Sequence, residues 1–161
     1  MRVLHVLAER GYSGGEQQLE FLVRHLHERG HSNGLVLVPG AKFESVGREL
    51  DLPIFRSDLR RPWMLSPLLA VRRAVRTFQP EVLHFGCGRS LLWGGIACRG
   101  LRVPLRITTR RIDYPIGRAP WRAGRYRRLV DHVVANCESV RRRVLDAGVP
   151  SGRVTLVHEG I

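Results

Sequence analysis

The stretch VLHVLAERGYSGGEQQLEFL, residues 3–22, decides the fold class. It begins as a short apolar run, passes through a turn that contains glycines, and continues as a segment with helical spacing. The apolar residues of that last part recur at intervals of three and four residues, at Leu19, Leu22, Val23 and Leu26. Gly30 is a typical stop signal for such a helix. The stretch therefore predicts a strand, a tight turn and a helix, which is the first unit of an alternating α/β chain.

The same alternation continues to the end of the chain. Short β-branched or leucine-rich runs predict strands near 2–8, 34–38, 53–56, 81–86, 104–109, 132–136 and 153–157. Amphipathic segments between them predict helices near 14–29, 43–50, 66–78, 89–99, 119–130 and 137–147. For the third helix, Ser66 is expected as the N-cap, Pro67 as a first-turn residue and Pro80 as the stop. The predicted fold is α/β: one Rossmann-like, doubly wound, mainly parallel sheet of about seven strands flanked by helices, in a single domain, residues 1–161.

The strongly basic composition favours anionic partners but does not show which kind of anion the chain binds. The formal net charge is +13, and Lys42 is the only lysine, so the basic residues are almost all arginines. A guanidinium group makes planar, paired contacts with phosphate or carboxylate. This charge fits nucleic acid, an anionic membrane surface or a phosphorylated small molecule. Nucleic-acid binding is not expected, because no RNA or DNA recognition motif accompanies the charge.

Cysteine usage and hydropathy predict a cytoplasmic protein without a metal. Cys87, Cys98 and Cys137 are scattered and lack histidines at ligand spacing, so we expect neither a disulfide framework nor a metal site. No run approaches the roughly 18 apolar residues of a spanning helix. The N-terminus also lacks the pattern of a signal peptide.

The turn GYSGG, residues 11–15, has two interpretations. In an open parallel sheet, ligands collect beyond the carboxyl ends of the strands, and this turn follows the first strand. Without a Cβ at Gly14 or Gly15, the amides of the helix N-terminus can receive phosphate oxygens. The alternative is a plain tight corner, because glycine often serves conformation alone. The spacing differs from G-x-G-x-x-G, so a dinucleotide site is only weakly supported.

Two further strands are predicted to end at the same edge. The fourth continues as HFGCGRS, where His84 is either a core imidazole or a site residue, and Gly86 leaves open space. The fifth ends in TTRRID, where Arg110 and Arg111 can grip an anion and Asp113 follows. A solvated or Asp-paired turn is an equal alternative for these arginines.

Two segments combine arginine with aromatic residues, RRPWMLSPLLAVRRAVR and GRAPWRAGRYRRLV. Such surfaces suit the headgroup layer of an anionic membrane, where arginine meets phosphate and tryptophan lies at the boundary. The expected membrane-docking residues are Arg60, Arg61, Trp63, Trp121, Arg122, Arg125 and Arg128. The alternative is a solvated basic helix whose tryptophan packs in the core.

Several segments together resemble a known family. They are VLHVLAERGYSGGEQQLEFLVRHLHERGH, PEVLHFG, VPLRITTRR and DHVVANCESVRRRVLDAGVPSGRVTLVHEGI. Their order and spacing resemble the N-terminal, acceptor-side domain of the retaining GT-B glycosyltransferases, the glycosyltransferase family 4-like group. The resemblance covers essentially the whole chain. It implies one half of a GT-B fold, with the C-terminal donor-binding domain absent from this chain.

The resemblance also implies a site in the cleft between the two domains. The donor diphosphate and the acceptor would lie near Gly14, Gly15, His84, Gly86, Arg110, Arg111, Asp113, Glu138 and Glu159. Many members carry a second histidine two residues after the one that matches His84, but this chain has Gly86 there. The resemblance therefore assigns no catalytic residue. Chemistry in this family is generally independent of a bound metal, so no cofactor is expected beyond the nucleotide-sugar co-substrate.

The resemblance thus implies the acceptor-binding domain of a glycosyltransferase that transfers a sugar from a nucleotide-diphosphate sugar to lipopolysaccharide, another surface glycan or a lipid-linked acceptor. The chain alone is expected to be inactive, because most of the donor site belongs to the missing domain. The expected location is the cytoplasm, with docking on the inner face of the membrane. The alternative function is a non-catalytic module of the same fold that binds an anionic lipid or glycan.

Overall fold

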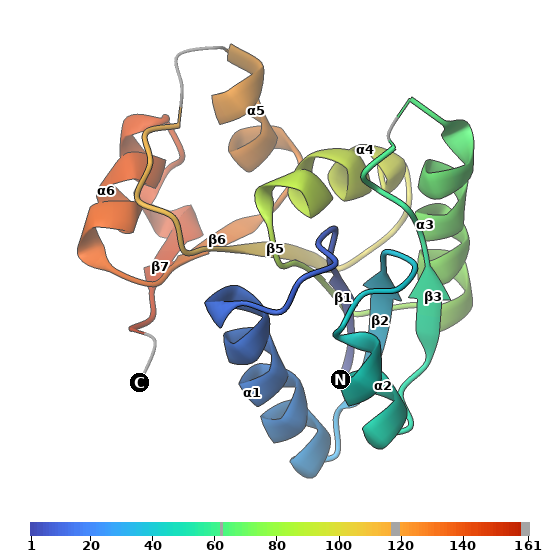
Figure 1. Ribbon diagram of the computed structural model, residues 1–161. Coiled ribbons are helices and arrows are strands. Elements are labelled where there is room, and N and C mark those ends of the chain that lie inside the picture. Colours follow the sequence, from blue (N-terminus) through green and yellow to red (C-terminus); the bar gives the residue numbers. More distant parts are fainter. Residues whose placement is uncertain (62, 117–119, 159–161) are drawn as a thin grey trace.

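One sheet of seven parallel strands organises the chain, in the order β3-β2-β1-β4-β5-β6-β7 (Figure 1). The computed structural model describes residues 1–61, 63–116 and 120–158, apart from the side chains of residues 120 and 121. The strands are β1 (Arg2–Val6), β2 (Ser32–Leu37), β3 (Ile54–Arg56), β4 (Val82–Phe85), β5 (Leu105–Arg110), β6 (His132–Ala135) and β7 (Val154–Leu156). All neighbouring strands pair in parallel. The predicted fold class, a single doubly wound parallel sheet, is confirmed.

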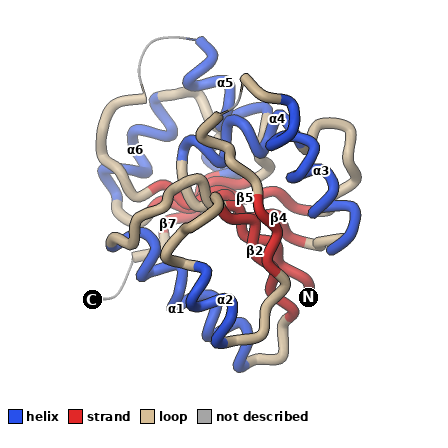
Figure 2. The backbone as a smooth tube through the Cα atoms, turned by 45° about the vertical axis from the view of Figure 1, so that its right-hand side comes forward, coloured by secondary structure: helices blue, strands red, loops and turns tan. Residues whose placement is uncertain are grey.

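Helices cover the sheet in two layers. The main helices are α1 (Gly14–Glu28), α2 (Glu44–Glu49), α3 (Leu65–Phe78), α4 (Gly95–Ala97), α5 (Pro120–Arg128) and α6 (Glu138–Asp146), and a short 3-10 turn, η2 (Ser151–Arg153), precedes β7. Helices α1 and α2 lie on one face, and α3 to α6 lie on the other (Figures 1 and 2). The strand order requires this split. From β1 to β3 the chain adds strands on one side of β1, and from β4 onward it adds them on the other side. Because each crossover is right-handed, reversing the direction moves the connecting helices to the opposite face of the sheet. None of the described helices is long and apolar enough to cross a membrane.

Two hydrophobic cores follow from the alternation of side chains along the central strands. Leu4 and Val6 of β1 belong to the larger core, together with residues of α3 to α6. Leu7 belongs to the smaller core, with Leu19 and Val23 of α1. A buried strand that contacts helices on both faces must be apolar on both sides, which explains the continuous apolar runs in the sequence.

The ends of α1 are set by local sequence. The carboxylate of Glu16 accepts hydrogen bonds from the backbone N–H and the hydroxyl of Ser13, at 2.9 and 2.5 Å, in a capping box. The pattern S-x-x-E could have predicted this cap. At the other end, Gly30 has a φ of +75°, which glycine adopts without strain. The predicted stop at Gly30 is confirmed.

The start of α3 differs from the prediction. The helix begins at Leu65 and its N-cap is Met64, in extended backbone, so the assignment of Ser66 as N-cap is wrong. Pro67 is tolerated in the first turn because the amide it lacks would have no partner within the helix. Its carbonyl accepts a hydrogen bond from the buried Ser57 hydroxyl at 2.7 Å. Gln79, with a φ of +50°, ends the helix directly before Pro80, as predicted.

The helix predicted near 89–99 is divided into a π-helical turn, η1 (Ser90–Gly94), and the short α4. Glycines at the junction allow close packing against β4 and α5. A Cβ at Gly94 would lie 2.8 Å from the Phe85 ring, and one at Gly95 would lie 2.8 Å from Leu129. Close packing of these glycines holds the segment after β4 in place, beside the site described below.

Candidate functional site

A cleft of about 440 Å³ opens at the carboxyl edge of the sheet, where β1, β4 and β5 end. Its walls come from five segments that are distant in sequence: the loop after β1, the first turn of α1, the loop after β4, the end of β5, and α5. The lining residues are Glu9, Ser13, Gly15, Glu16, Gly86, Cys87, Gly88, Thr108, Thr109, Arg110, Arg111, Ile112, Arg125 and Tyr126. The cleft lies at the edge where parallel α/β sheets bind ligands.

The N-terminus of α1 forms one wall of the cleft. A Cβ built at Gly14 or Gly15 would meet no atom within 4 Å, so the backbone there faces open space. The helix dipole places partial positive charge at this end of a 15-residue helix. Glu16 offsets part of it, because its carboxylate is bound to Ser13 at the same end. The turn therefore has the space and the amides that an anion site requires, and phosphate binding there stays a prediction.

Two arginines and a tyrosine form a fixed cationic wall opposite α1. The Arg110 guanidinium donates to the Tyr126 hydroxyl at 2.9 Å and to the Tyr114 carbonyl. Arg125 donates to the Gly88 carbonyl at 3.3 Å, and its guanidinium lies 5.0 Å from the Tyr126 ring centroid. Arg110 is 5.7 Å from the same centroid. Tyr126 thus holds both cations through its hydroxyl and its ring face, so their positions are set before any ligand binds.

This wall has an energetic cost. The Nε atoms of Arg110 and Arg125 are buried and have no hydrogen-bond partner within the described part of the chain. A buried, unpaired donor typically costs about 1–3 kcal/mol. A buried, unpaired donor needs an explanation, and a site in which position matters more than stability gives one.

The structure brings four of the predicted site residues together. Gly15, Gly86, Arg110 and Arg111 line one cleft, although they come from three different strand ends. Gly14 is the first residue of α1, directly beside this lining. The rule that parallel strands present their carboxyl ends at one edge thus placed these residues correctly.

Of three other predicted site residues, two lie outside the cleft lining and the third is not described by the structure. Asp113 is exposed and pairs with Arg143 of α6 at 3.3 Å. Glu138 pairs with Arg141 and Arg142, at 3.1 and 3.6 Å. Neither carboxylate is among the residues that line the cleft. Glu159 is among the residues that the structure does not describe.

His84 lies beneath the cleft and is fully buried. Its Nδ1 is 3.1 Å from Nδ1 of His5 on β1, and its Nε2 is 2.9 Å from the Thr109 hydroxyl on β5. His5 Nε2 is 3.2 Å from the Asn33 side-chain oxygen on β2. The core interpretation of His84 is therefore correct, but side chains rather than backbone satisfy the ring. We name the set Asn33, His5, His84 and Thr109 the polar row.

Burial controls the charge of the two histidines. It lowers the pKa of His5 to about 4, against a smaller opposing effect of its hydrogen bond to Asn33. Burial also holds the pKa of His84 well below its ordinary value, and the positive charge of Arg111 acts in the same direction. Both rings are therefore neutral at pH 7.

Sequence reasoning missed the partnership of His5 with His84. A signal was present, because residues 3–6 read VLHV and residues 82–85 read VLHF. The two strands pair in register, so that His5 lies directly beside His84. Only the strand order makes the two patterns neighbours, and that order does not follow from local pattern.

Most of the expected membrane-docking residues that the structure describes are exposed. Arg60, Arg61 and Trp63 are exposed, and 76% of the Trp63 surface is accessible. Arg122 and Arg128 are exposed on α5. Arg125, also expected in this docking set, is half-buried: it donates to the Gly88 carbonyl in the cleft wall and also lines the groove between α4 and α5. The side chain of Trp121 lies outside the described residues.

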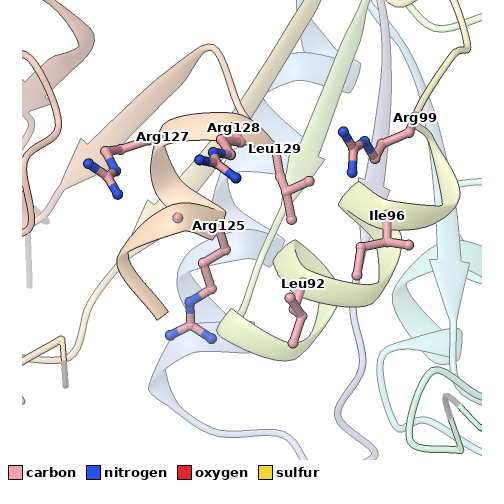
Figure 3. A pocket seen from close by; sticks show the side chains of 8 residues that line it. Leu92, Ile96, Arg99, Arg125, Arg127, Arg128 and Leu129 are labelled. Carbon is pink, nitrogen blue, oxygen red and sulfur yellow. The ribbon is translucent and has the colours of Figure 1, made fainter. Parts of the chain in front are cut away.

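A shallow groove of about 360 Å³ runs between α4 and α5 on this outer side. Figure 3 shows Leu92 and Ile96 on one side of the groove and Leu129 on the other, with Arg99, Arg125, Arg127 and Arg128 also lining it. The groove has an apolar floor and a cationic rim. This combination suits an amphiphile with an anionic head.

The described residues contain no group of three or more His, Cys, Asp or Glu side chains that is arranged to hold a metal ion. The cations nearest the cleft are the arginines Arg110, Arg111 and Arg125. Those guanidinium groups and the amides of α1 are groups in the described cleft that can bind an anion.

Comparison with solved structures shows the same fold in glycosyltransferases. The chain aligns with HepE from Anabaena, solved in complex with UDP and glucose, at a TM-score of 0.76 and 15% identity, covering 100% of this chain and 45% of that one. A glycosyltransferase from Rickettsia africae gives a TM-score of 0.77 and 17% identity, covering 99% and 43%. MurG from Acinetobacter baumannii gives 0.72 and 14%, covering 99% and 45%. The chain thus spans less than half the length of the solved structures it matches.

A search of curated proteins found no match to the chain. The model of one protein family, Glycosyltransferase Family 4, matches residues 12–161. That match includes the turn before α1, every strand after β1, and all the arginines of the cleft. The chain therefore belongs to Glycosyltransferase Family 4.

Proposed function

We propose that the chain is the acceptor-binding half of a retaining glycosyltransferase that uses a nucleotide-diphosphate sugar. Its acceptor is a surface glycan, a lipopolysaccharide or a lipid-linked glycan. The observation that carries the proposal is the cleft at the carboxyl edge, where the open N-terminus of α1 faces the guanidinium groups held by Tyr126. This half would meet a separate donor-binding domain across that cleft, and alone it would not complete the transfer.

Charge explains what the cleft contributes to such a reaction. When a glycosyl group leaves a nucleotide diphosphate, negative charge grows on the departing phosphate oxygen. Fixed donors and cations stabilise that charge more than they stabilise the ground state, and they need no reorganisation during the reaction. Arg110 and Arg125 are fixed in this sense, because Tyr126 and the Gly88 carbonyl hold them. The amides at Gly14 and Gly15 add partial positive charge on the opposite side.

The solved structures support the substrate class. HepE binds UDP and glucose, and in another crystal UDP-glucose, while a further match is a lipopolysaccharide outer core galactosyltransferase, WaaB, at a TM-score of 0.74 and 10% identity. A nucleotide sugar as donor and a cell-envelope glycan as acceptor are therefore the first substrates to test for this chain.

Docking on an anionic membrane would bring the chain to a lipid-linked acceptor. The support is the groove between α4 and α5, with its apolar floor and arginine rim, and the exposed Leu65, Leu69 and Trp63 around the start of α3. Arginine contacts with headgroup phosphates and apolar contacts with the acyl boundary act together at such a surface. A cytoplasmic protein that docks on the inner leaflet fits this surface.

A sugar-transfer assay tests the function. The chain is joined to a donor-binding domain of the same family and incubated with UDP-, GDP- and ADP-sugars and with acceptor extracts from bacterial envelopes. We expect the release of a nucleoside diphosphate that depends on the acceptor, and a product with the anomeric configuration of the donor. A variant with Arg110→Ala should lower kcat/KM for transfer on the order of 100-fold without unfolding the chain. Acceptor binding without turnover for any donor would favour the non-catalytic glycan-binding or lipid-binding module instead.

A further inference from the structure

The polar row runs across four strands and ends in the cleft. Asn33, His5, His84 and Thr109 belong to β2, β1, β4 and β5, which are neighbours in that order. The pairing register places His5 beside His84, and Thr109 two residues beyond the partner of His84. Side chains two residues apart on a strand share a face, so the row leads along one face of the sheet toward the carboxyl edge. Thr109 is the member of the row that lines the cleft.

The direction of the hydrogen bonds along the polar row is set by Asn33, the buried member farthest from the cleft. The Asn33 amide nitrogen lies 3.4 Å from the Val23 carbonyl and 3.3 Å from the His31 carbonyl. Both are acceptors, so the amide NH₂ must point toward them, and the Asn33 oxygen points toward His5. A flipped amide would place its oxygen against two carbonyl oxygens. His5 Nε2 therefore carries a proton and donates it to Asn33.

If both imidazole rings are neutral, the positions of the remaining protons in the row follow. Both histidines are buried, and within the described chain neither forms an ion pair with a carboxylate, so a charged ring would be costly. A neutral imidazole has one donor and one acceptor nitrogen. His5 Nδ1 is thus the acceptor, and His84 Nδ1 donates to it across 3.1 Å. His84 Nε2 is left as an acceptor, so the Thr109 hydroxyl must donate to it across 2.9 Å.

We propose that Thr109 is a specificity-determining residue that presents only hydrogen-bond acceptors to the cleft and selects a hydroxyl group of the ligand. A threonine hydroxyl has one proton and two lone pairs, and His84 takes the proton. The Thr109 oxygen then accepts from a sugar hydroxyl, but it cannot donate to a phosphate or carboxylate oxygen. The arginines bind the anionic part of the ligand, and the Thr109 oxygen accepts a hydrogen bond from a hydroxyl group of another part. This inference rests on the proposed function, because it assigns the sugar of that reaction to this side of the cleft.

The proton positions can be tested without any ligand. Long-range ¹H–¹⁵N correlation spectra of the chain distinguish protonated from bare imidazole nitrogens. We expect a proton on Nε2 and none on Nδ1 of His5, and the opposite arrangement in His84. A proton on Nε2 of His84 would overturn the inference, because Thr109 would then be free to donate into the cleft. This measurement uses the unchanged protein, so it does not depend on the folding of a variant.

Ligand selection is tested with two probes, a panel of methyl glycosides and inorganic pyrophosphate, each titrated into the chain by NMR. Thr109→Val should weaken binding of the best glycoside by about tenfold. The sugar hydroxyl that donates to the Thr109 oxygen would lose its acceptor inside the cleft. Thr109→Ser keeps the hydroxyl and should restore that binding. Neither variant should change pyrophosphate binding. Equal weakening of both probes by Thr109→Val, or no glycoside binding by the unchanged chain, would overturn the inference.

Failure of the inference differs from failure of the proposed function. If the histidine tautomers and the glycoside series behave as expected but no donor supports sugar transfer, the chain binds sugars without catalysis. If transfer occurs but Thr109→Val leaves glycoside binding unchanged, the function holds and the role of Thr109 is wrong.

Discussion

Arginines of the cleft and arginines of the outer surface have the same chemistry but different surroundings. Arg110 and Arg125 are half-buried and held by Tyr126, with Arg125 also bound to the Gly88 carbonyl. Arg60, Arg61 and Arg128 are exposed, and the ion pair of Arg61 with Asp58, at 3.6 Å, lies at the surface. A fixed guanidinium selects the geometry of an anion, whereas exposed guanidiniums act through their summed charge, which salt screens. The two regions should therefore respond very differently to the same substitution.

The largest effect is expected from Arg110→Ala. In the joined two-domain enzyme, kcat/KM for sugar transfer should fall on the order of 100-fold, as when one fixed donor to a developing anion is removed. Initial rates with a saturating acceptor and varied nucleotide sugar give this value. The matched control is Arg128→Ala, which removes an exposed arginine of α5 that does not line the cleft. Equal losses in the two variants would contradict the distinction between the regions.

A smaller effect is expected from Gly15→Val. The new side chain would enter the open cleft beside the amides of α1, because a Cβ there meets no atom within 4 Å. Pyrophosphate binding should weaken by roughly tenfold, or about 1.4 kcal/mol, with little change in the unfolding midpoint. Gly152→Ala is the control, since it is equally open but lies in η2, outside the cleft lining. If Gly15→Val binds pyrophosphate normally, the turn is only a tight corner.

Acid should weaken the sheet beneath the cleft. The unfolded chain protonates its histidines near pH 6.5, whereas burial lowers the pKa of His5 in the folded chain to about 4. Stability from this group is therefore complete above about pH 6.5 and is lost as the pH falls toward 4. From pH 7 to pH 5.5, we expect a loss of about 1 kcal/mol from His5, or roughly 2–4 °C in the unfolding midpoint.

Circular dichroism melts at a series of pH values measure this loss. The control is His27→Gln, which changes an exposed histidine of α1 outside the buried pair. His5→Asn should reduce the pH dependence and leave the part that comes from His84. A pH dependence that is the same in all three proteins would show that the buried pair does not govern acid stability.

The smallest effect is expected at the outer surface. Arg128→Gln should weaken binding to phosphatidylglycerol vesicles by about threefold to fivefold, because one basic residue near an anionic surface contributes about 1 kcal/mol. Vesicle sedimentation at low and high salt measures it, and high salt should abolish most of the binding. Pyrophosphate binding in the cleft should not change. Binding that is insensitive to salt would remove the argument for electrostatic docking.

The sequence predicted the elements and the position of the site better than its internal contacts. Strand and helix positions depend on local periodicity, and all seven strands and the six predicted helical segments are found close to where they were expected. Gly15, Gly86, Arg110 and Arg111 meet because parallel strands end at one edge, which is a general rule.

Contacts that depend on strand order and helix rotation could not be predicted in this way. His5 meets His84 only because β1 and β4 are neighbours. Arg125 lines both the cleft and the outer groove because of its position on α5, whereas Arg127 and Arg128 line the groove but not the cleft (Figure 3). Asp113 forms an ion pair with Arg143, an arginine thirty positions later in the chain. Each of these contacts is a property of the assembled sheet.

The most direct test of the cleft as the anion site is a residue-resolved NMR titration of the chain with inorganic pyrophosphate at two salt concentrations. We predict saturable shifts of the Gly15, Gly86 and Gly88 amides and of the Arg110 and Arg125 side-chain signals, which persist in high salt. Shifts confined to Arg60, Arg61 and Arg128, which disappear in high salt, would contradict the account.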